Sequence, residues 1–457
     1  MSYIGSTPTT QSFISGTDYF NGTGSQTAFT LSRSVASVND IQATVNNVVQ
    51  VPNDAYTISG TTITFTSAPS SGTSNVYVRY LSTTTQSITP SQGTVGWSTL
   101  NSDLQQDLGI SFKNRIINGA MVISQRGTGS TTVASSGYYS CDMWNVSISQ
   151  ASKVSIQQNA GSVTPPVGFK NYVGITTVSS YTPAAGDYGT LRTFVEGYNA
   201  ADLMWGSASA KTITLSFQVY SSLTGTFGGA LQNNAGNRSY PFTYSIPVAN
   251  TWTTISITIA GDTTGTWATD NSRGIEVDFN IASGSTYQGT AGAWAAGGYY
   301  SATGATNMVA TASSTFYLTA VQLEVGTQAT TFDNRSYGTE LLLCQRYYQA
   351  LSYADQASVS IGTADSASGC QAPINLLQTM RTAPTITLPS AAKTTGTQAF
   401  LTSGGTYPTT VGSHTTPSIS VNQFRINASG YTAAFVQGNA TWLYSTGSTT
   451  ITASAEL

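Results

Sequence analysis

Short runs in which hydrophobic and polar residues alternate recur along most of the 457-residue chain. Side chains that alternate with a period of two belong to strands that place one face on a core. The runs are rich in Thr, Val, Ile and Tyr, and they are separated by Gly, Asn, Ser and Pro, which favour turns. We therefore predict an all-β protein. The clearest runs are KVSIQQ, YVGITTV, TITLSFQVYS, WTTISITI and IEVDFNI.

Residues 1–88 are predicted to form a compact β domain. IQATVNNVVQVP contains two strands around Asn46-Asn47, and Asn tolerates the left-handed conformation that a type I′ hairpin turn requires. The segments YTISGTTITF and NVYVRYL add a second hairpin and a further strand.

Residues 89–112 are predicted to be a linker with one short helix, in STLNSDLQQDLG. Leu100, Leu104 and Leu108 form an apolar stripe one residue wide on this helix. A helix this short cannot hold alone. We expect it to form a small bundle with identical chains, with these leucines as contacts. The alternative is that it packs on the next domain of its own chain.

Residues 113–335 form the largest unit. Many short strands over about 200 residues are typical of a β-sandwich or jelly roll. Residues 336–351 predict a connecting helix that is apolar around nearly its whole circumference, so it must be buried against another domain or another copy. Residues 352–457 form the last β domain. The predicted contacts between copies on the connecting helix are Leu341, Cys344 and Tyr348.

The composition narrows the class of ligand. Charged residues make up 8% of the chain, against roughly 25% in ordinary globular proteins, and the net charge is −3. Aromatic residues reach 11%, so this is not the composition of a disordered chain. A surface of hydroxyls and amides suits hydroxyl-rich ligands and does not attract nucleic acid. No apolar run approaches the length of a membrane span, so no membrane insertion is expected.

Residues that carry catalysis or bind metals are scarce. The chain has one histidine, His414, and three scattered cysteines, which excludes the usual zinc spacings and a disulfide framework. Glu276 and Asp278 alternate in IEVDFN and would share one strand face, at a spacing that a retaining glycosidase could use. The simpler interpretation is the polar face of an amphipathic strand. We predict no catalytic residue, no metal and no cofactor.

Aromatic side chains are the feature of the sequence that favours ligand binding, and the chain has 25 Tyr, 16 Phe and 7 Trp. An aromatic ring can bind the apolar face of a sugar while amides and hydroxyls take its OH groups. The alternative for each ring is packing in a core. The candidates for ligand binding are Trp294, Tyr299 and Tyr300 in the large domain and Tyr407, Tyr431, Trp442 and Tyr444 in the last domain.

Several segments resemble bacteriophage tail fibres of the marine and cyanobacterial phages. NGTGSQTAFTLSRSV and the strands that follow it resemble the module that attaches the fibre to the tail. FKNRIINGAMVISQRG resembles the start of the carbohydrate-binding-module-like jelly roll in these fibres. Asp142-Met143-Trp144 matches a DRW-like triplet, although Met143 replaces the usual Arg, so any ion pair of that Arg is missing. VQLEVGTQATTFDNRSYGTELLLCQRYY and INLLQTMRTAPTITL resemble the junction and the distal receptor-binding module.

The resemblance implies an elongated homotrimer of serial β-sandwich and jelly-roll domains joined by short helices. Residues 1–88 would contact tail proteins of the adaptor, nozzle or baseplate, and residues 352–457 would bind the receptor. The implied function is non-catalytic adhesion to a host surface glycan such as lipopolysaccharide. The protein would be assembled in the host cytoplasm and located in the virion tail.

Two other functions remain open. An enzymatic tailspike would cleave host polysaccharide instead of only binding it. A bacterial secreted lectin or adhesin would need an export signal, and MSYIGSTPTT shows neither a basic nor an apolar segment of that kind.

Overall fold

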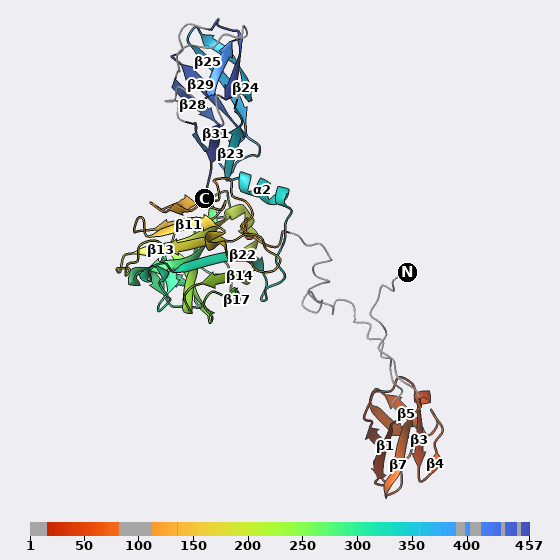
Figure 1. Ribbon diagram of the computed structural model, residues 1–457. Coiled ribbons are helices and arrows are strands. Elements are labelled where there is room, and N and C mark those ends of the chain that lie inside the picture. The colour runs from red at the N-terminus through yellow and green to blue at the C-terminus, as the bar shows by residue number, and fades with distance from the viewer. Residues whose placement is uncertain are drawn as a thin grey trace. The chain divides into compact units, whose positions relative to one another are not determined.

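The computed structural model describes residues 16–81, 112–134, 136–355, 357–389, 398–402, 413–430, 435–445 and 449–457. The chain divides into two compact units, Met1–Leu100 and Asn101–Leu457. The all-β prediction is confirmed, because the described residues contain one α-helix, α2 (Tyr337–Gln345), among many strands (Figure 1). The predicted helix with Leu100, Leu104 and Leu108 lies outside the described residues.

The first unit packs two antiparallel sheets around a small core. Asn46 and Asn47 have φ values of 50° and 65° between β3 and β4, so the hairpin predicted there is confirmed. Buried residues such as Tyr56, Ile63 and Val76 fill the space between the sheets. The sheets run β1 (Thr17–Gly22), β7 (Gly72–Tyr80), β3 (Ile41–Val45), β4 (Val48–Val49), and β2 (Ala28–Thr30), β6 (Thr62–Phe65), β5 (Tyr56–Ser59).

The second unit begins with a jelly-roll-like sandwich of a seven-stranded and a six-stranded sheet. Apolar side chains from both sheets form one core, which includes Ile275, Val277 and Phe279 as the alternation predicts. The seven-stranded sheet runs β20 (Ala295–Ala296), β16 (Arg238–Ile246), β15 (Gly225–Gln232), β18 (Arg273–Ser283), β13 (Tyr188–Glu196), β10 (Asn145–Ile148), β9 (Tyr138–Tyr139). The six-stranded sheet runs β17 (Thr253–Ile259), β14 (Ile213–Ser221), β22 (Thr315–Val325), β12 (Val173–Thr177), β11 (Val154–Gln158), β8 (Thr131–Thr132). A short parallel pair, β19 (Gln288–Gly289) and β21 (Ser301–Ala302), completes this part.

The last part of the chain is also a pair of sheets. Leu351, Ile426, Leu443 and Ile451 belong to its own small core. A three-stranded sheet runs β23 (Tyr348–Tyr353), β31 (Thr449–Ser454), β26 (Thr385–Thr387), and a six-stranded sheet runs β27 (Gln398–Thr402), β30 (Ala440–Ser445), β24 (Ser358–Ser366), β25 (Gly369–Asn375), β29 (Gln423–Ser429), β28 (Ser413–Ile419).

The connecting helix is shorter and less buried than the sequence suggested. Ser336 caps it through its side chain, but it ends at Gln345, and Tyr348 already begins β23 by pairing with Ser454. Leu342 is 50% exposed, so the expectation of burial on all sides is wrong.

The predicted contacts between copies on this helix find partners within the chain. Cys344 is fully buried in the jelly-roll core, and Leu341 packs against that core. Tyr348 is also buried, beneath the guanidinium of Arg126. Cys344 and Tyr348 therefore have almost no exposed surface to offer another copy, which corrects that prediction for these two residues.

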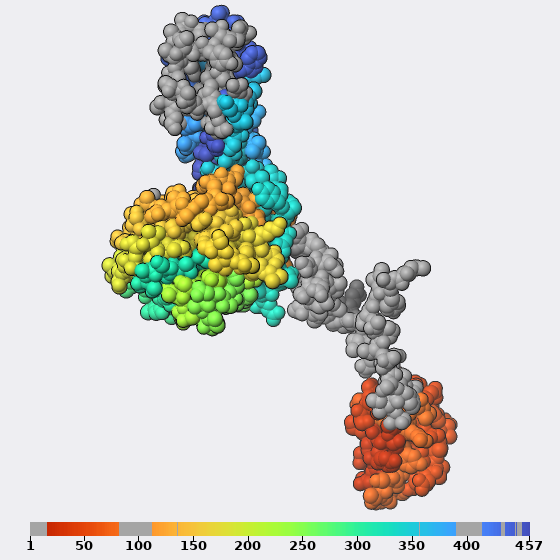
Figure 2. Space-filling model, in the orientation of Figure 1, coloured from red at the N-terminus to blue at the C-terminus, as the bar shows by residue number. Residues whose placement is uncertain are grey.

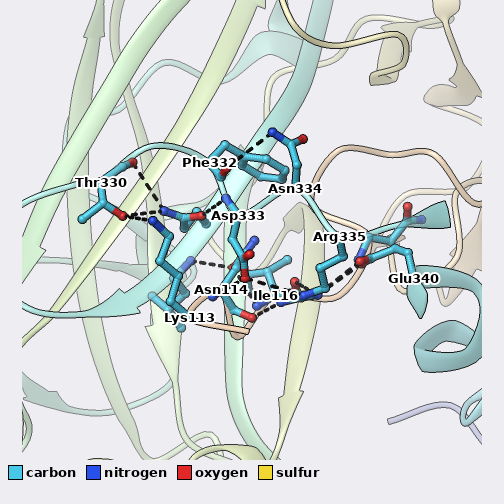
Figure 3. Close-up of polar contacts among 12 residues, drawn as sticks. Lys113, Asn114, Ile116, Thr330, Phe332, Asp333, Asn334, Arg335 and Glu340 are labelled. Carbon is cyan, nitrogen blue, oxygen red and sulfur yellow. Dashed lines mark hydrogen bonds and ion pairs between the residues drawn. The ribbon is translucent and has the colours of Figure 1, made fainter. Parts of the chain in front are cut away.

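A cluster of polar side chains connects the segment that opens the jelly roll with the segment that follows its last strand (Figure 3). Asn114 donates to the carbonyl of Val321 at 2.9 Å and accepts from the amide of Leu323 at 3.0 Å. Arg335 reaches the carbonyl of Ile116 at 3.2 Å and the carboxylate of Glu340 at 3.3 Å. The first and last segments of the jelly roll are thereby tied together.

The same cluster fixes the start of α2. Glu340, in the first turn of the helix, also accepts a hydrogen bond from the amide of Asn118. In the space-filling view, the residues around α2 lie against those that open the jelly roll (Figure 2). The segments that begin and end the jelly roll thus form one closing clasp, made by Asn114, Asp333, Arg335 and Glu340.

Candidate functional site

The strongest candidate site is the face of the seven-stranded sheet that points away from the core. Antiparallel pairing places Arg192 of β13 opposite Asp278 of β18, and Asn145 of β10 opposite Arg192. Because side chains alternate along a strand, Glu276 and Asp278 point to the face opposite Val277. Three neighbouring strands thus bring amide, guanidinium and carboxyl groups together on one face.

Arginines hold Glu276 from two sides. Arg192 donates to Glu276 at 2.8 Å and to the amide oxygen of Asn145 at 2.9 Å. Arg273 donates to the other oxygen of the same carboxylate at 2.5 Å. Glu276 is only 4% exposed, so this paired carboxylate is shielded from water. Both oxygens of this carboxylate are therefore occupied by arginine side chains.

Asp278 has a different environment. It is fully buried, and Gln232 of β15 donates to it at 3.0 Å. Burial, reinforced by the neighbouring Glu276, raises the pKa of Asp278 well above its ordinary value. A protonated Asp278 could donate a hydrogen bond as well as accept one. The formal charges of Arg192 and Arg273 balance those of Glu276 and Asp278 on this face.

Three tyrosines stand beside these polar groups. Tyr300 lies 5.5 Å from Tyr188 and 5.2 Å from Tyr287 between ring centroids, and Tyr188 meets Tyr287 edge-to-face at 5.4 Å. All three are partly exposed. Burial and the nearby acids Asp278 and Glu276 raise the pKa of Tyr300 to about 12, so its phenol stays protonated. Rings with neutral hydroxyls suit contact with a polar ligand that has an apolar face.

Several buried oxygens on or near this face have no hydrogen-bond partner among the residues that the structure describes, including Oδ1 of Asp278. Another is the side-chain oxygen of Asn280, whose amide nitrogen donates to the carbonyl of Thr306 at 3.1 Å. A third is the hydroxyl of Ser301, next to Gly228. A buried polar atom normally has a partner, so each calls for a water or a ligand group. We define the sheet-face site by Asn145, Tyr188, Arg192, Gln232, Glu276, Asp278, Asn280, Tyr287, Tyr300 and Ser301.

Only one of the aromatics predicted in the jelly roll belongs to the sheet-face site, and it is Tyr300. Trp294 packs edge-to-face on Trp205 and Trp267, and its indole donates to the carbonyl of Ala260 at 2.7 Å. Tyr299 packs against Gly289 and lies close to Gly297. Trp294 and Tyr299 thus pack within the chain but are partly exposed, and ligand binding by them stays a prediction.

The aromatics predicted in the last domain are only partly described. Trp442 is 44% exposed on β30, beside Ile361 of β24, which is 63% exposed. Tyr407 and Tyr431 lie outside the described residues, and so does the side chain of Tyr444. Trp442 is therefore a surface residue, and ligand binding by it stays a prediction.

Sequence reasoning missed Tyr188, Tyr287 and Arg192. Tyr188 and Arg192 lie four residues apart on one strand, so the sequence indicates that they share a face. It does not indicate which residues of the neighbouring strands lie beside them. Tyr287 reaches the site from a short 3-10 helix, Ser285–Tyr287, about one hundred residues further along the chain.

In the described part of the chain, no three His, Cys, Asp or Glu side chains are grouped so that they could hold a metal ion. None of the described helices has the length and apolar character needed to cross a membrane. His414 lies in β28, and burial lowers its pKa.

No protein-family model matches the chain, and no curated protein is significantly similar. Solved structures with local similarity include the enzymatically active domain of tailspike protein 4 of bacteriophage CBA120, at 13% identity and a TM-score of 0.27, over 47% of this chain and 22% of that one. A family 11 carbohydrate-binding module from Clostridium thermocellum, in complex with a β-1,3-1,4-mixed-linked tetrasaccharide, gives 14% identity and a TM-score of 0.22, over 45% and 99%. The CBM22-1 xylan-binding domain from Paenibacillus barcinonensis Xyn10C gives 8% and 0.22, over 44% and 95%. With TM-scores below 0.5, these similarities do not identify a function.

Proposed function

We propose that the protein is a bacteriophage tail fibre that attaches the virion to a host surface polysaccharide by non-catalytic binding. The observation that carries the proposal is the sheet-face site. Three partly exposed tyrosines stand there beside a buried layer of amide and carboxyl groups. The exposed parts of their rings can stack on sugar rings, and their phenol groups can hydrogen-bond sugar hydroxyls.

The sequence supports the viral context. Residues 1–88, the jelly roll and the segment after it each resemble the corresponding part of a tail fibre. In this proposal the protein is a homotrimer of the virion tail, and residues 352–457 provide further receptor contacts. Repeated weak sites on three chains would raise the overall affinity by avidity.

An exposed apolar edge on the first unit fits a role in attachment to the tail. Val48 and Val49 form the short edge strand β4 and are 63% and 55% exposed, and Val51 beside them is 58% exposed. Exposed apolar strand edges are a liability unless a partner covers them. In the proposal, a tail protein of the adaptor, nozzle or baseplate pairs with this edge.

Cleavage of the polysaccharide is the second candidate, because Glu276 and Asp278 share one strand face. Two arginines occupy the Glu276 carboxylate, and Asp278 is fully buried, so neither acid is presented as a free nucleophile or general base. The proposal is therefore binding without hydrolysis.

A glycan array tests the proposal with the intact chain and two variants. Tyr300→Ala removes a ring of the sheet-face site, whereas Tyr220→Ala removes a matched tyrosine that stacks on Tyr317 at 5.3 Å on the other sheet. Binding to a defined glycan that Tyr300→Ala loses and Tyr220→Ala keeps supports the proposal. Equal binding by all three proteins would exclude the sheet-face site as the receptor site.

A further inference from the structure

A hollow in the jelly roll borders the sheet-face site, because Tyr139, which lines the hollow, pairs with Asn145 of that site. It has a volume of about 420 Å³, which falls in the range of ~300–1,000 Å³ that is typical of small-ligand sites. It lies between the turn after Arg126 and the edge strands β8 and β9. Its lining residues are Arg126, Gly127, Gly129, Thr131, Gly137, Tyr138, Tyr139 and Ser140.

Three glycines keep one side of this pocket free of side chains. A Cβ atom added to Gly127, Gly129 or Gly137 would meet no other atom within 4 Å. Gly127 and Gly137 also have φ values of 102° and 84°, which L side chains rarely adopt. Polar backbone groups of the glycines, with no side chains to cover them, therefore border the open space. Tyr138 and Tyr139, both partly exposed, add aromatic rings to the wall.

Arg126 is fixed at the pocket by contacts on several sides. Its guanidinium stacks on the rings of Tyr139, at 4.4 Å, and Tyr348, at 3.5 Å. It pairs with Glu456 and lies 3.5 Å from Asp142. The arginine is thus held in place as a hydrogen-bond donor, and the carboxylates of Glu456 and Asp142 neutralise its charge.

The electrostatics of the pocket do not favour an anion. Burial raises the pKa of Asp142 and the pKa of Glu456, and the one arginine that lines the pocket faces both acids. In addition, the Ser140 hydroxyl is buried without a hydrogen-bond partner among the described residues. A buried hydroxyl of this kind calls for a water or ligand group in the adjacent space.

We propose that this pocket binds a single neutral sugar residue, a hexopyranose or an N-acetylhexosamine, as a second glycan site of the jelly roll. The apolar face of the sugar lies against Tyr138 or Tyr139, and its hydroxyls meet the glycine backbone and Arg126. The class of ligand rests on the proposed function, but the location of the site does not.

Saturation-transfer-difference NMR on the full chain tests the pocket directly. The probes are the methyl glycosides of glucose, galactose, mannose and N-acetylglucosamine, with sodium glucuronate as the anionic probe. Gly129→Trp fills the pocket at a position with no left-handed φ and no atom within 4 Å of the new Cβ. Gly186→Trp is the matched control, because Gly186 is equally open but lies outside the pocket.

The inference predicts a signal from at least one neutral glycoside in the wild type and in Gly186→Trp, and its loss in Gly129→Trp. If Gly129→Trp melts below the wild type, the smaller Gly129→Leu takes its place. An unchanged signal in the filled pocket, a signal from glucuronate alone, or no signal from any glycoside would each overturn the inference.

Tyr300→Ala separates this inference from the proposed function. A glycoside signal that survives Tyr300→Ala and is lost in Gly129→Trp belongs to the pocket, whatever happens at the sheet face. A polysaccharide that needs Tyr300 but yields no pocket signal leaves the proposed function standing and removes the second site.

Discussion

Arg335→Ala tests the closing clasp of the jelly roll. The arginine side chain is 5% exposed and pairs with Glu340 at 3.3 Å and Asp333 at 3.7 Å. It also donates to the carbonyls of Asn114 and Ile116. Removing it leaves two buried carboxylates without their cation and two carbonyls without their donor.

The expected loss of stability is large. Breaking a buried ion pair by removing one partner costs ~3–5 kcal/mol, because the remaining charge stays buried and unpaired. The carbonyl hydrogen bonds belong to the same group, so their contributions do not simply add. We take about 4 kcal/mol for the whole change. In a domain of about 200 residues, 1 kcal/mol corresponds to a shift of ~2–4 °C in Tm, so Tm should fall by roughly 8–16 °C.

Differential scanning calorimetry measures this change, with two comparison variants. Lys170→Ala removes a cation from an exposed position of the same domain and should leave Tm nearly unchanged. Arg335→Met combined with Glu340→Gln removes the Arg335–Glu340 pair and leaves only Asp333 without its cation, so it should recover part of the loss. The account of the clasp is refuted if Arg335→Ala melts within about 2 °C of Lys170→Ala, since exposed charges contribute little.

Four further predictions follow from individual residues. Asp278 has a raised pKa in the folded state, so between its unfolded and folded values the folded chain binds more protons and stability falls as pH rises; Asp278→Asn should flatten this fall in Tm as the pH rises above the ordinary Asp pKa of 3.8. Trp442 is 44% exposed, so Trp442→Ala should lower Tm far less than the ~3–5 kcal/mol cost of a buried Trp, and if it binds receptor it should still reduce adsorption to host cells. Val49→Lys should leave the melting of residues 1–88 unchanged but reduce incorporation of the fibre into virions, as counted by electron microscopy. Sedimentation should give three times the 47.7 kDa chain mass, and Leu104→Asp should lower that mass, whereas a stable monomer at micromolar concentration would exclude the trimer.

Local patterns in the sequence predicted the strands well. Ile275, Val277 and Phe279 alternate with polar residues and lie in the core, and Asn46-Asn47 forms the expected hairpin turn. Each of these features depends on a period of two or on the backbone preference of one residue type. Such information is contained in a few neighbouring positions.

The end of the connecting helix could not be predicted from neighbouring residues alone. Apolar residues continue past Gln345 and predict a helix that includes Tyr348, but Tyr348 pairs with Ser454 in a strand. The partner lies about one hundred residues away, and β-forming residues follow their pairing more than their neighbours.

The candidate site could not be assembled from the sequence for the same reason. Tyr188, Tyr287 and Tyr300 converge only because β13, β18 and the segment after it are placed together by the sheet. The contacts of Trp294 with Trp205 and Trp267 are likewise set by segments far apart in the sequence. The sequence gives the residue types, whereas the pairing of distant strands decides which of them face a ligand.

The central claim is that the sheet face binds a host polysaccharide without cleaving it. Isothermal titration of the intact chain with the glycan identified on the array, followed by a reducing-end assay on the same sample, tests both parts together. The account predicts saturable binding that Tyr300→Ala abolishes and Tyr220→Ala preserves, with no new reducing ends. Binding that Tyr300→Ala leaves intact, or reducing ends that disappear in Glu276→Gln, would contradict it.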